Sequence, residues 1–494
     1  MSIPWPSCSH LSNLSSPDAI PTRLPCTMKT LDQIAAELQG YDPQALSAHS
    51  VNAFLEQMAE PVGEAERVGI FEALGRVLAE DVVSPVNVPP HDNSAMDGYA
   101  FAGHQLAHQT PLTLKVVGTA LAGIAWRGTV NASECLKIMT GAIMPAGLDT
   151  VVPQEFVTVQ SGQGEAVITI PPGLLQTGDN RRLMGEDLPA GQVALRRGER
   201  LAPAALGLIA SLGLQDVQVW RKLRVAYFST GDEILSLGDS PQEGTVYDSN
   251  RYTVFGLLAR LGVDMIDLGV VRDEPLALAA AFTRAATRAD AIITSGGVSV
   301  GEADHTKTMM QRLAGDSGGG VAFWRIAMRP GRPMAVGLLP RNMQHFEEKK
   351  ARNPYEKGLS SCHSDSNLNA VEATDQKFSV LFGLPGNPVA VMVTFLAFVR
   401  PALLKMMGST EMPPPLLKAQ STQAIRKKPG RTEYQRGIVS TVADGLLQVR
   451  ITGNQGSGVL SSMAQANGLI VLHHDQGNVA AGELVDVMMF DGVI

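Results

Sequence analysis

The feature that most constrains the fold is a regular alternation of two apolar patterns over residues 223–410. Short runs such as 225–228 and 291–294 are apolar throughout, whereas 249–262 and 276–288 carry apolar residues at helical spacing. Alternating strands and helices build a mostly parallel sheet with helices on both faces, because parallel neighbours need crossover connections. The pattern predicts a three-layer αβα domain, with further strands at 265–271, 323–328, 334–339 and 378–382 and further helices at 308–313 and 389–407.

The part of the chain before this domain follows other patterns. Residues 1–48 begin with Pro and Ser clusters, and we expect a largely disordered N-terminal extension. Residues 49–222 form an N-terminal region in which 51–62 and 71–85 resemble amphipathic helices of a linker domain. Short apolar segments between Gly and Pro indicate an inserted β domain at about 86–185.

Two further segments complete the organisation. Residues 341–377 are polar and rich in Asn, Ser, Glu and Lys, and they predict a long surface insertion within the αβα domain. Residues 411–494 follow a run of three prolines and alternate short polar and apolar stretches, which predicts a small C-terminal β domain. The fold class expected is therefore a multidomain α/β protein.

Composition excludes several classes of function. The net charge of −8 and the lack of a basic stripe argue against nucleic acid as a partner. The four cysteines form no CxxC pair, which fits a reducing cytoplasm. The longest apolar run, 389–399, is too short to span a bilayer, and no signal peptide is recognisable. We therefore predict a cytoplasmic protein without a membrane partner.

Ligands of open α/β sheets bind beyond the carboxyl ends of the strands, so the residues after each strand are candidates. These residues are polar, charged or shaped by Gly and Pro after every expected strand except 334–339. A Gly-rich loop can point backbone N–H groups at a phosphate, and carboxylates beside it can hold a divalent cation. Together the segments predict a site for a phosphorylated ligand and a metal, formed by 229–233, 272–274, 295–304, 329–332 and 383–388.

Each segment taken alone also has an ordinary explanation. Asp273 could begin a helix, because acids favour helix N-termini. Asn387 and Pro388 suit the cap and first position of a helix, although an exposed helix N-terminus is also an anion site. Arg329 and Arg332 could be solvated surface charges. The combination of basic groups, amides and carboxylates favours the site.

Other polar loops lie outside the αβα domain. The loop 89–100 carries Asp97, while Thr140 and Asp187 stand in similar polar interruptions of the β region. A capped turn is the simplest explanation of the first loop. In the C-terminal domain, two Gly-containing segments offer Arg431, Arg436 and Ser457.

At this point the sequence resembles a known family. The motifs DNSAMDGYA, IMTGA, GED, STGDE, YDSNR, SGGVSVGEAD, GLPGNP, PGR…QRG and QGS occur in the order found in the molybdopterin molybdenumtransferase (MoeA) family, to which the E domain of gephyrin is related. The resemblance spans about residue 50 to the C-terminus. It implies that molybdate and adenylylated molybdopterin are substrates, and that the pyrophosphate link is cleaved with Mg2+ while molybdenum is inserted and AMP is released.

The resemblance also implies partners and residue roles. It implies a homodimer whose active site is shared between subunits, supplied by a molybdopterin adenylyltransferase and serving acceptor molybdoenzymes. It gives catalytic roles to Asp97, Thr140, Asp187, Glu233, Asp273 and Asp304, with the last three around Mg2+. It assigns ligand binding to Ser295, Gly296, Gly297, Ser299, Gly301, Pro385, Gly386, Asn387 and Pro388, and molybdate to Arg329, Arg332, Arg431 and Ser457.

The chain departs from the family at two places. Arg329 and Arg332 replace a lysine pair, so a planar fork stands where the family has a point charge. The insertion at 341–377 is expected to loop away from the site. Two alternatives share the fold: a hydrolase of nucleotide pyrophosphates, and a scaffold that binds molybdopterin without catalysis. The N-terminal and C-terminal motifs argue against the first, and the retained carboxylates argue against the second.

Overall fold

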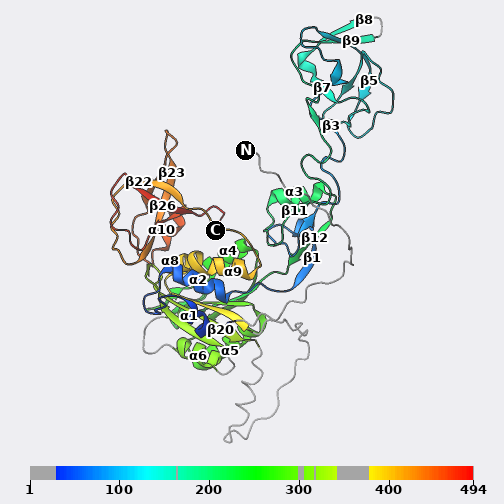
Figure 1. Ribbon diagram of the computed structural model, residues 1–494. Helices are drawn as coiled ribbons and strands as arrows, with labels where there is room; N and C mark the ends of the chain where they lie inside the picture. The colour runs from blue at the N-terminus through cyan, green and yellow to red at the C-terminus, as the bar shows by residue number, and fades with distance from the viewer. Residues whose placement is uncertain (1–28, 163–164, 299–304, 316–318, 342–377, 493–494) are drawn as a thin grey trace, which may run out of the picture.

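The computed structural model describes residues 29–492 except 163–164, 299–304, 316–318 and 342–377. Four domains are visible in Figure 1. The α/β domain lies at the lower centre, and the C-terminal β domain packs above it on one side. On the other side a small linker domain carries the inserted β domain at the end of an arm, away from the α/β domain.

The α/β domain contains a six-stranded sheet in the order β16-β13-β17-β21-β20-β18. The first four strands run parallel, and β20 is antiparallel to both of its neighbours. The exit of β20 therefore lies at the opposite edge of the sheet from the others. The bounds are β13 Arg224–Thr230, β16 Asp264–Val271, β17 Ala291–Ser295, β18 Gly320–Arg325, β20 Pro333–Pro340 and β21 Phe378–Leu384.

Helices cover both faces of this sheet, so the prediction of three layers is confirmed. Alternate residues of β13 point to opposite faces: Val225 belongs to one core cluster and Ala226 to the other. On one face lie α4 (Ser249–Leu261), α8 (Pro388–Thr394) and α9 (Arg400–Met406), the last two joined by a π-helical turn, Phe395–Val399. On the other face lie α5 (Pro275–Arg288) and α6 (His305–Gly315).

The continuous helix Pro388–Met406 is long and apolar enough to cross a membrane by length and composition. However, 78% of the residues in its most apolar window are buried inside the protein. The helix contributes side chains such as Phe395 and Phe398 to the core of the α/β domain. Its apolar character is thus explained by packing.

The first described residues belong to the α/β domain and differ from the extension expected up to residue 48. Helices α1 (Leu31–Glu37) and α2 (Ala48–Met58) pack against the same face as α4. Thr30 and Gln33 form a capping box at the start of α1, and Ile34 is fully buried. The ring of Phe54 in α2 meets Trp324 edge to face at 4.9 Å. Two short amphipathic helices therefore complete this core.

The linker domain is built on the antiparallel pair β1 (Ala65–Gly69) and β12 (Asp216–Trp220), with α3 (Pro203–Ser211). The prediction of a helix at 71–85 is wrong. The segment begins with a 3-10 turn, Ile70–Glu72, and Gly75 then adopts a φ of +74°. Beyond this turn the chain extends and forms bridges, so the apolar spacing reflects strand-like contacts.

The inserted β domain has a six-stranded sheet in the order β7-β4-β6-β5-β9-β8. The short pair β3 (Asn93–Ser94) and β10 (Arg181–Arg182) lies at its base. The pair β2 (Val82–Val83) and β11 (Val193–Leu195) belongs to the linker domain, because Val82 and Leu195 pack in its core. The sheet strands are β4 Gly98–Phe101, β5 Leu112–Ala120, β6 Glu134–Ile138, β7 Thr150–Pro153, β8 Thr158–Gly162 and β9 Glu165–Ile170.

The C-terminal domain is a small closed barrel, because β23 pairs with both β24 and β25. A short strand of the α/β domain, β19 (Met328–Arg329), adds to it by pairing parallel with β23. The barrel strands are β22 Leu417–Ser421, β23 Thr432–Thr441, β24 Leu447–Ile451, β25 Gly468–Leu472 and β26 Leu484–Met489, and α10 is Leu460–Gln465. The β19–β23 pairing fixes this barrel beside the strand ends of the α/β sheet.

Candidate active site

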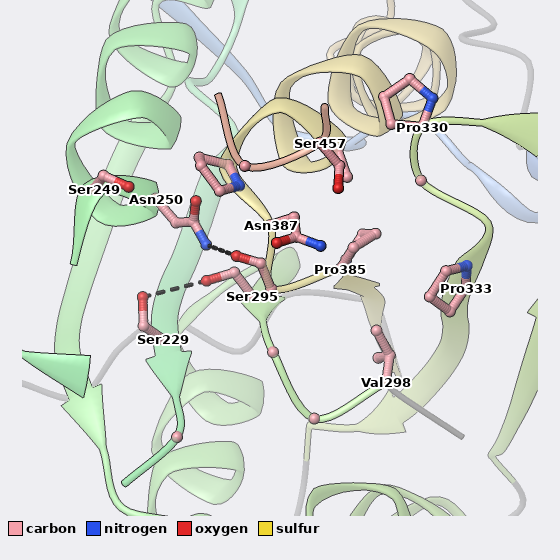
Figure 2. A pocket seen from close by; sticks show the side chains of 18 of the residues that line it. Ser229, Ser249, Asn250, Ser295, Val298, Pro330, Pro333, Pro385, Asn387 and Ser457 are labelled. Carbon is pink, nitrogen blue, oxygen red and sulfur yellow. Dashed lines mark hydrogen bonds between the residues drawn. The ribbon is translucent and has the colours of Figure 1, made fainter. Parts of the chain in front are cut away.

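A cavity of about 1220 Å³ lies at the carboxyl ends of β13, β17 and β21, where these strands meet the barrel (Figure 2). Every strand-end segment named from the sequence contributes to it. Its lining residues come from 229–234, 246–250, 273, 295–298, 328–333, 385–390, 431 and 455–458. Polar loops of two domains thus converge on one space, as the rule for open α/β sheets requires.

The Gly-rich loop after β17 forms one wall. Gly296 and Gly297 have φ values of +90° and +64°, which L-residues rarely adopt. A Cβ on Gly296 would lie 2.4 Å from the carbonyl oxygen of Thr230, and one on Gly297 would lie 2.4 Å from the Thr306 side chain. The backbone therefore approaches its neighbours too closely for any other residue. Ser299 and Gly301, also predicted here, lie outside the described residues.

Below this loop three hydroxyl groups meet. The phenol of Tyr227 lies 2.9 Å from Ser229 Oγ and 2.7 Å from Ser295 Oγ. Both serines line the cavity, and Figure 2 shows their side chains facing one another. Burial, the largest effect, raises the pKa of Tyr227, so this phenol is neutral throughout the physiological pH range.

The start of α4 forms the neighbouring wall. Asn250 donates from Nδ2 to the carbonyl of Gly386 at 2.7 Å and so holds the GLPGNP loop in place. Asp248 caps the helix by accepting from the N–H of Arg251. Both side chains are buried, and Asp248 Oδ2 and Asn250 Oδ1 have no partner among the described residues. These two oxygens are buried acceptors in residues that border the cavity.

Two carboxylates reach the cavity from the ends of β13 and β16. Glu233 and Asp273 both line it, and Asp273 Oδ1 accepts from Thr306 Oγ1 at 3.2 Å. Asp304, the third predicted acid, lies outside the described residues. In the part of the chain that is described, no group of three or more His, Cys, Asp or Glu could hold a metal alone. Two acids suit Mg2+, which binds through one or two carboxylates plus phosphate and water.

The opposite wall is basic. The β19–β23 register places Arg329 beside Glu433, and both Arg329 and Arg332 line the cavity. Arg431 Nη2 lies 2.7 Å from Glu433 Oε1, so part of its charge is offset while it still borders the space. The fourth predicted residue of this group, Ser457, also reaches the cavity (Figure 2).

The loop that presents Ser457 is held from behind by Arg436. This fully buried guanidinium donates to the carbonyls of Asn454, Gln455 and Gly456 at 2.9–3.2 Å. Burial and the nearby Arg329 lower the pKa of Arg436 to about 10. With the carbonyls turned towards Arg436, the planar peptide groups direct their N–H groups the other way. The sequence analysis did not assign Arg436 a role in the site.

The predicted residues of the inserted β domain lie elsewhere. Asp97 Oδ1 accepts from both the N–H and the hydroxyl of Thr140, each at 2.7 Å. These hydrogen bonds, from the Thr140 backbone first, lower the pKa of Asp97. Asp187 is anchored through its N–H to the carbonyl of Val88 at the base of the same domain. None of the three lines the cavity, and Figure 1 shows their domain at the far end of the arm.

The cavity residues Asp248, Asn250 and Gln455 lie outside the segments predicted for the site, whereas Ser229 belongs to the predicted segment 229–233 without a role of its own. A signal existed for Asp248 and Asn250, since they stand in the YDSNR motif at a helix start. For Gln455 the signal was weaker. It precedes Ser457 in a loop whose only distinguishing feature is its glycines.

A three-layer α/β fold with a phosphate-type loop, acids and arginines at one sheet edge defines a class of proteins that bind phosphorylated ligands. Comparison with known proteins narrows this class. Residues 46–213 match the MoeA N-terminal region (domain I and II), 226–405 a probable molybdopterin binding domain, and 418–490 the MoeA C-terminal region (domain IV).

Individual relatives agree over nearly the whole chain. A molybdopterin molybdenumtransferase of Haemophilus influenzae is 38% identical over 89% of this chain and 97% of its own length. A molybdopterin molybdenumtransferase of a Nostoc species is 32% identical over 94% of this chain and 98% of its own length. Gephyrin of Dictyostelium discoideum is 29% identical over 89% of this chain but 61% of its own length.

Solved structures give the same result. A molybdopterin biosynthesis MoeA protein from Pyrococcus horikoshii aligns over 90% of this chain and 99% of its own, with a TM-score of 0.63 and 27% identity. The chain therefore belongs to the molybdopterin molybdenumtransferase family. The predictions of this family, of the transferase class and of a role in molybdenum cofactor biosynthesis are confirmed.

Proposed function

We propose that the protein inserts molybdenum from molybdate into adenylylated molybdopterin, with Mg2+-dependent cleavage of the pyrophosphate link and release of AMP. The observation that carries this proposal is the single cavity with two chemically different walls. A glycine loop and acids lie on one wall, and arginines and Ser457 lie on the other. This arrangement suits a reaction that brings a phosphorylated pterin and an oxyanion together.

On the phosphate wall, the loop 295–298 offers the hydroxyl of Ser295 and closely packed backbone to the ligand. Glu233 and Asp273 would hold Mg2+, with Asp304 as the predicted third acid. When bound, the cation offsets phosphate charge and polarises the phosphoryl group.

On the basic wall, Arg329, Arg332, Arg431 and Ser457 would bind molybdate. A small dianion needs positive charge and several donors, and guanidinium groups supply both. At positions 329 and 332, where the resemblance implies lysines, arginines add planar pairs of N–H donors. Arg436 would support this wall by holding the Ser457 loop.

We further propose a homodimer in which the inserted β domain of one subunit completes the cavity of the other. Asp97, Thr140 and Asp187 form a polar surface that does not line the cavity of their own chain. Next to the cavity, α4 and the preceding strand expose apolar side chains, including Tyr252, Phe255 and Val246. Such a patch suits contact with a second copy. The expected site of action is the cytoplasm, between a molybdopterin adenylyltransferase and acceptor molybdoenzymes.

The test mixes purified protein with adenylylated molybdopterin, molybdate and Mg2+ and follows AMP release and cofactor formation. We expect AMP release to depend on molybdate and to be lost in Asp273→Ala. The matched control Asp264→Ala changes an exposed acid at the other end of the strand β16 and should keep activity. AMP release without molybdate would indicate a pyrophosphate hydrolase, and binding without turnover would indicate a scaffold.

A further inference from the structure

The three hydroxyl groups below the glycine loop form a closed set. Tyr227 and Ser229 are two residues apart on β13, so their side chains share one face of the sheet. In the parallel register of β13 and β17, Ser229 stands opposite Ser295. The two serine oxygens are 3.3 Å apart, and the phenol bridges them at 2.9 and 2.7 Å. Strand register therefore creates this cluster.

Counting protons shows what the cluster can offer. Each hydroxyl group donates one proton and accepts others, so three hydroxyls can satisfy three contacts in a ring. When a ligand oxygen approaches one serine, that serine can turn its proton outwards. It then accepts from Tyr227, and Tyr227 accepts from the other serine. Two internal hydrogen bonds remain, and one proton is donated to the ligand without an unpaired buried group.

Burial makes Tyr227 the fixed member of this set. Its side chain is fully buried in the core cluster shared with α4, whereas both serines border the cavity. The raised pKa of its phenol keeps the proton in place. Without the phenol, the serine oxygens retain only their contact of 3.3 Å, which is long for two hydroxyl groups.

We propose that Tyr227 is a positioning residue, which orients the hydroxyl groups of Ser229 and Ser295 so that one of them donates to a phosphate oxygen of the ligand. The proposal rests on the proposed function for the identity of that ligand. Tyr227 does not touch the ligand itself. Because the effect passes through a serine, it is specific to the phosphate group and coupled to the serine that donates.

The test measures the binding of AMP and adenosine to Tyr227→Phe by calorimetry, beside wild type and Tyr99→Phe. We expect Tyr227→Phe to lose about tenfold in AMP affinity, the effect of one hydrogen bond to a charged group, and to bind adenosine as wild type does. The control Tyr99→Phe removes a buried phenol of the inserted β domain and should change neither affinity. Urea unfolding confirms that each variant is folded.

A double-mutant comparison gives the second measurement. Tyr227→Phe is measured in Ser229→Ala and in Ser295→Ala backgrounds. In the background that lacks the donating serine it should reduce AMP affinity by much less than tenfold, because the orienting path is already broken. Equal losses for AMP and adenosine, or full additivity with both serine variants, would overturn the proposal. Failure of the proposed function gives a different result. If the wild-type protein binds AMP but forms no molybdenum cofactor, the proposed reaction is wrong. The AMP and adenosine affinities of Tyr227→Phe still test the positioning role of Tyr227.

Discussion

Asp290, whose side chain is fully buried, joins three parts of the chain. Its carboxylate receives two hydrogen bonds from Arg221 at 2.7 and 2.9 Å, one from Arg341 at 2.5 Å and one from the N–H of Arg224 at 2.8 Å. Arg221 lies between the linker domain and β13, and Arg341 follows β20. The carboxylate therefore fixes the junction of two domains to the end of the sheet.

Removing this carboxylate should be costly. We expect Asp290→Ala to lower the free energy of unfolding by about 3–5 kcal/mol, because buried guanidinium groups lose their partner. Asp216→Ala is the matched control, since it breaks an exposed ion pair with Arg67. The side chain of Asp216 is 43% exposed and that of Arg67 is 63% exposed. That change should cost less than about 1 kcal/mol. If urea unfolding shows a similar loss of unfolding free energy in Asp290→Ala and Asp216→Ala, the structural role of Asp290 is contradicted.

The same residue predicts a pH dependence. Burial alone would raise the pKa of Asp290, but hydrogen bonds and charge from Arg221 outweigh it and lower the pKa. Because the pKa of Asp290 is lower in the folded protein, the unfolded chain binds the proton more readily. The ionised carboxylate therefore makes its full contribution to the free energy of unfolding above the pKa of an unfolded aspartate, about 3.9. This contribution is lost as the pH falls through the lower pKa of the folded protein. Urea unfolding from pH 7 to 3 should show the gap between wild type and Asp290→Ala narrowing below about pH 4; a constant gap would refute this.

At the scale of elements, the glycine loop depends on the spacing between the ends of β13 and β17. A Cβ on Gly296 would meet the carbonyl of Thr230, whereas Gly262, at the end of α4 with a φ of +78°, has open space around it. We expect Gly262→Ala to cost about 1–2 kcal/mol from backbone strain alone. Gly296→Ala should cost clearly more and also weaken AMP binding. If urea unfolding gives the same loss of unfolding free energy for Gly296→Ala and Gly262→Ala, the contact between the added Cβ and the Thr230 carbonyl has been relieved and the prediction is wrong.

The elements of the α/β domain could largely be predicted from periodicity. The helices α4 and α5 and the strands β13 and β17 were found because burial on both faces leaves continuous apolar runs, and amphipathic helices leave a period of 3.6 residues. The segment 71–85 has similar spacing but is extended, because its apolar residues bridge to strands distant in sequence. The spacing of apolar residues within one segment cannot predict contacts with segments that are distant in the sequence.

The site was predictable where it follows strand ends and hidden where it depends on register or burial. Arg329 and Ser295 stand in conspicuous Gly- and Pro-containing segments. The cluster around Tyr227 requires Ser229 to stand opposite Ser295, and no sequence pattern gives that alignment. Arg436 stands in the PGRTEYQRG segment that the sequence already points to, but only its burial among three carbonyls reveals its support of the Ser457 loop.

At the scale of the whole molecule, the proposed sharing of the site between two subunits predicts complementation. Asp97→Ala and Glu233→Ala should each be inactive alone, since one alters the arm and the other the cavity. After unfolding and refolding as an equal mixture, half of the dimers would carry one intact site, which restores about a quarter of wild-type activity. A mixture of Glu233→Ala with Asp273→Ala is the matched control and should stay inactive, because both changes lie in one cavity. Absence of recovery in the first mixture would contradict a site shared between subunits.

The order in which the cavity walls occur along the chain has a consequence for synthesis on the ribosome. The glycine loop, Glu233 and Asp273 precede residue 300 and the 385–388 loop closes the α/β part of the cavity, while Arg431 and the 455–458 loop come from the barrel near the C-terminus. All segments of the proposed phosphate wall have therefore been translated by residue 388, before any residue of the barrel. The proposed oxyanion wall is completed only after residue 458 has emerged, so we expect the molybdate site to be the last part of the cavity to form during synthesis.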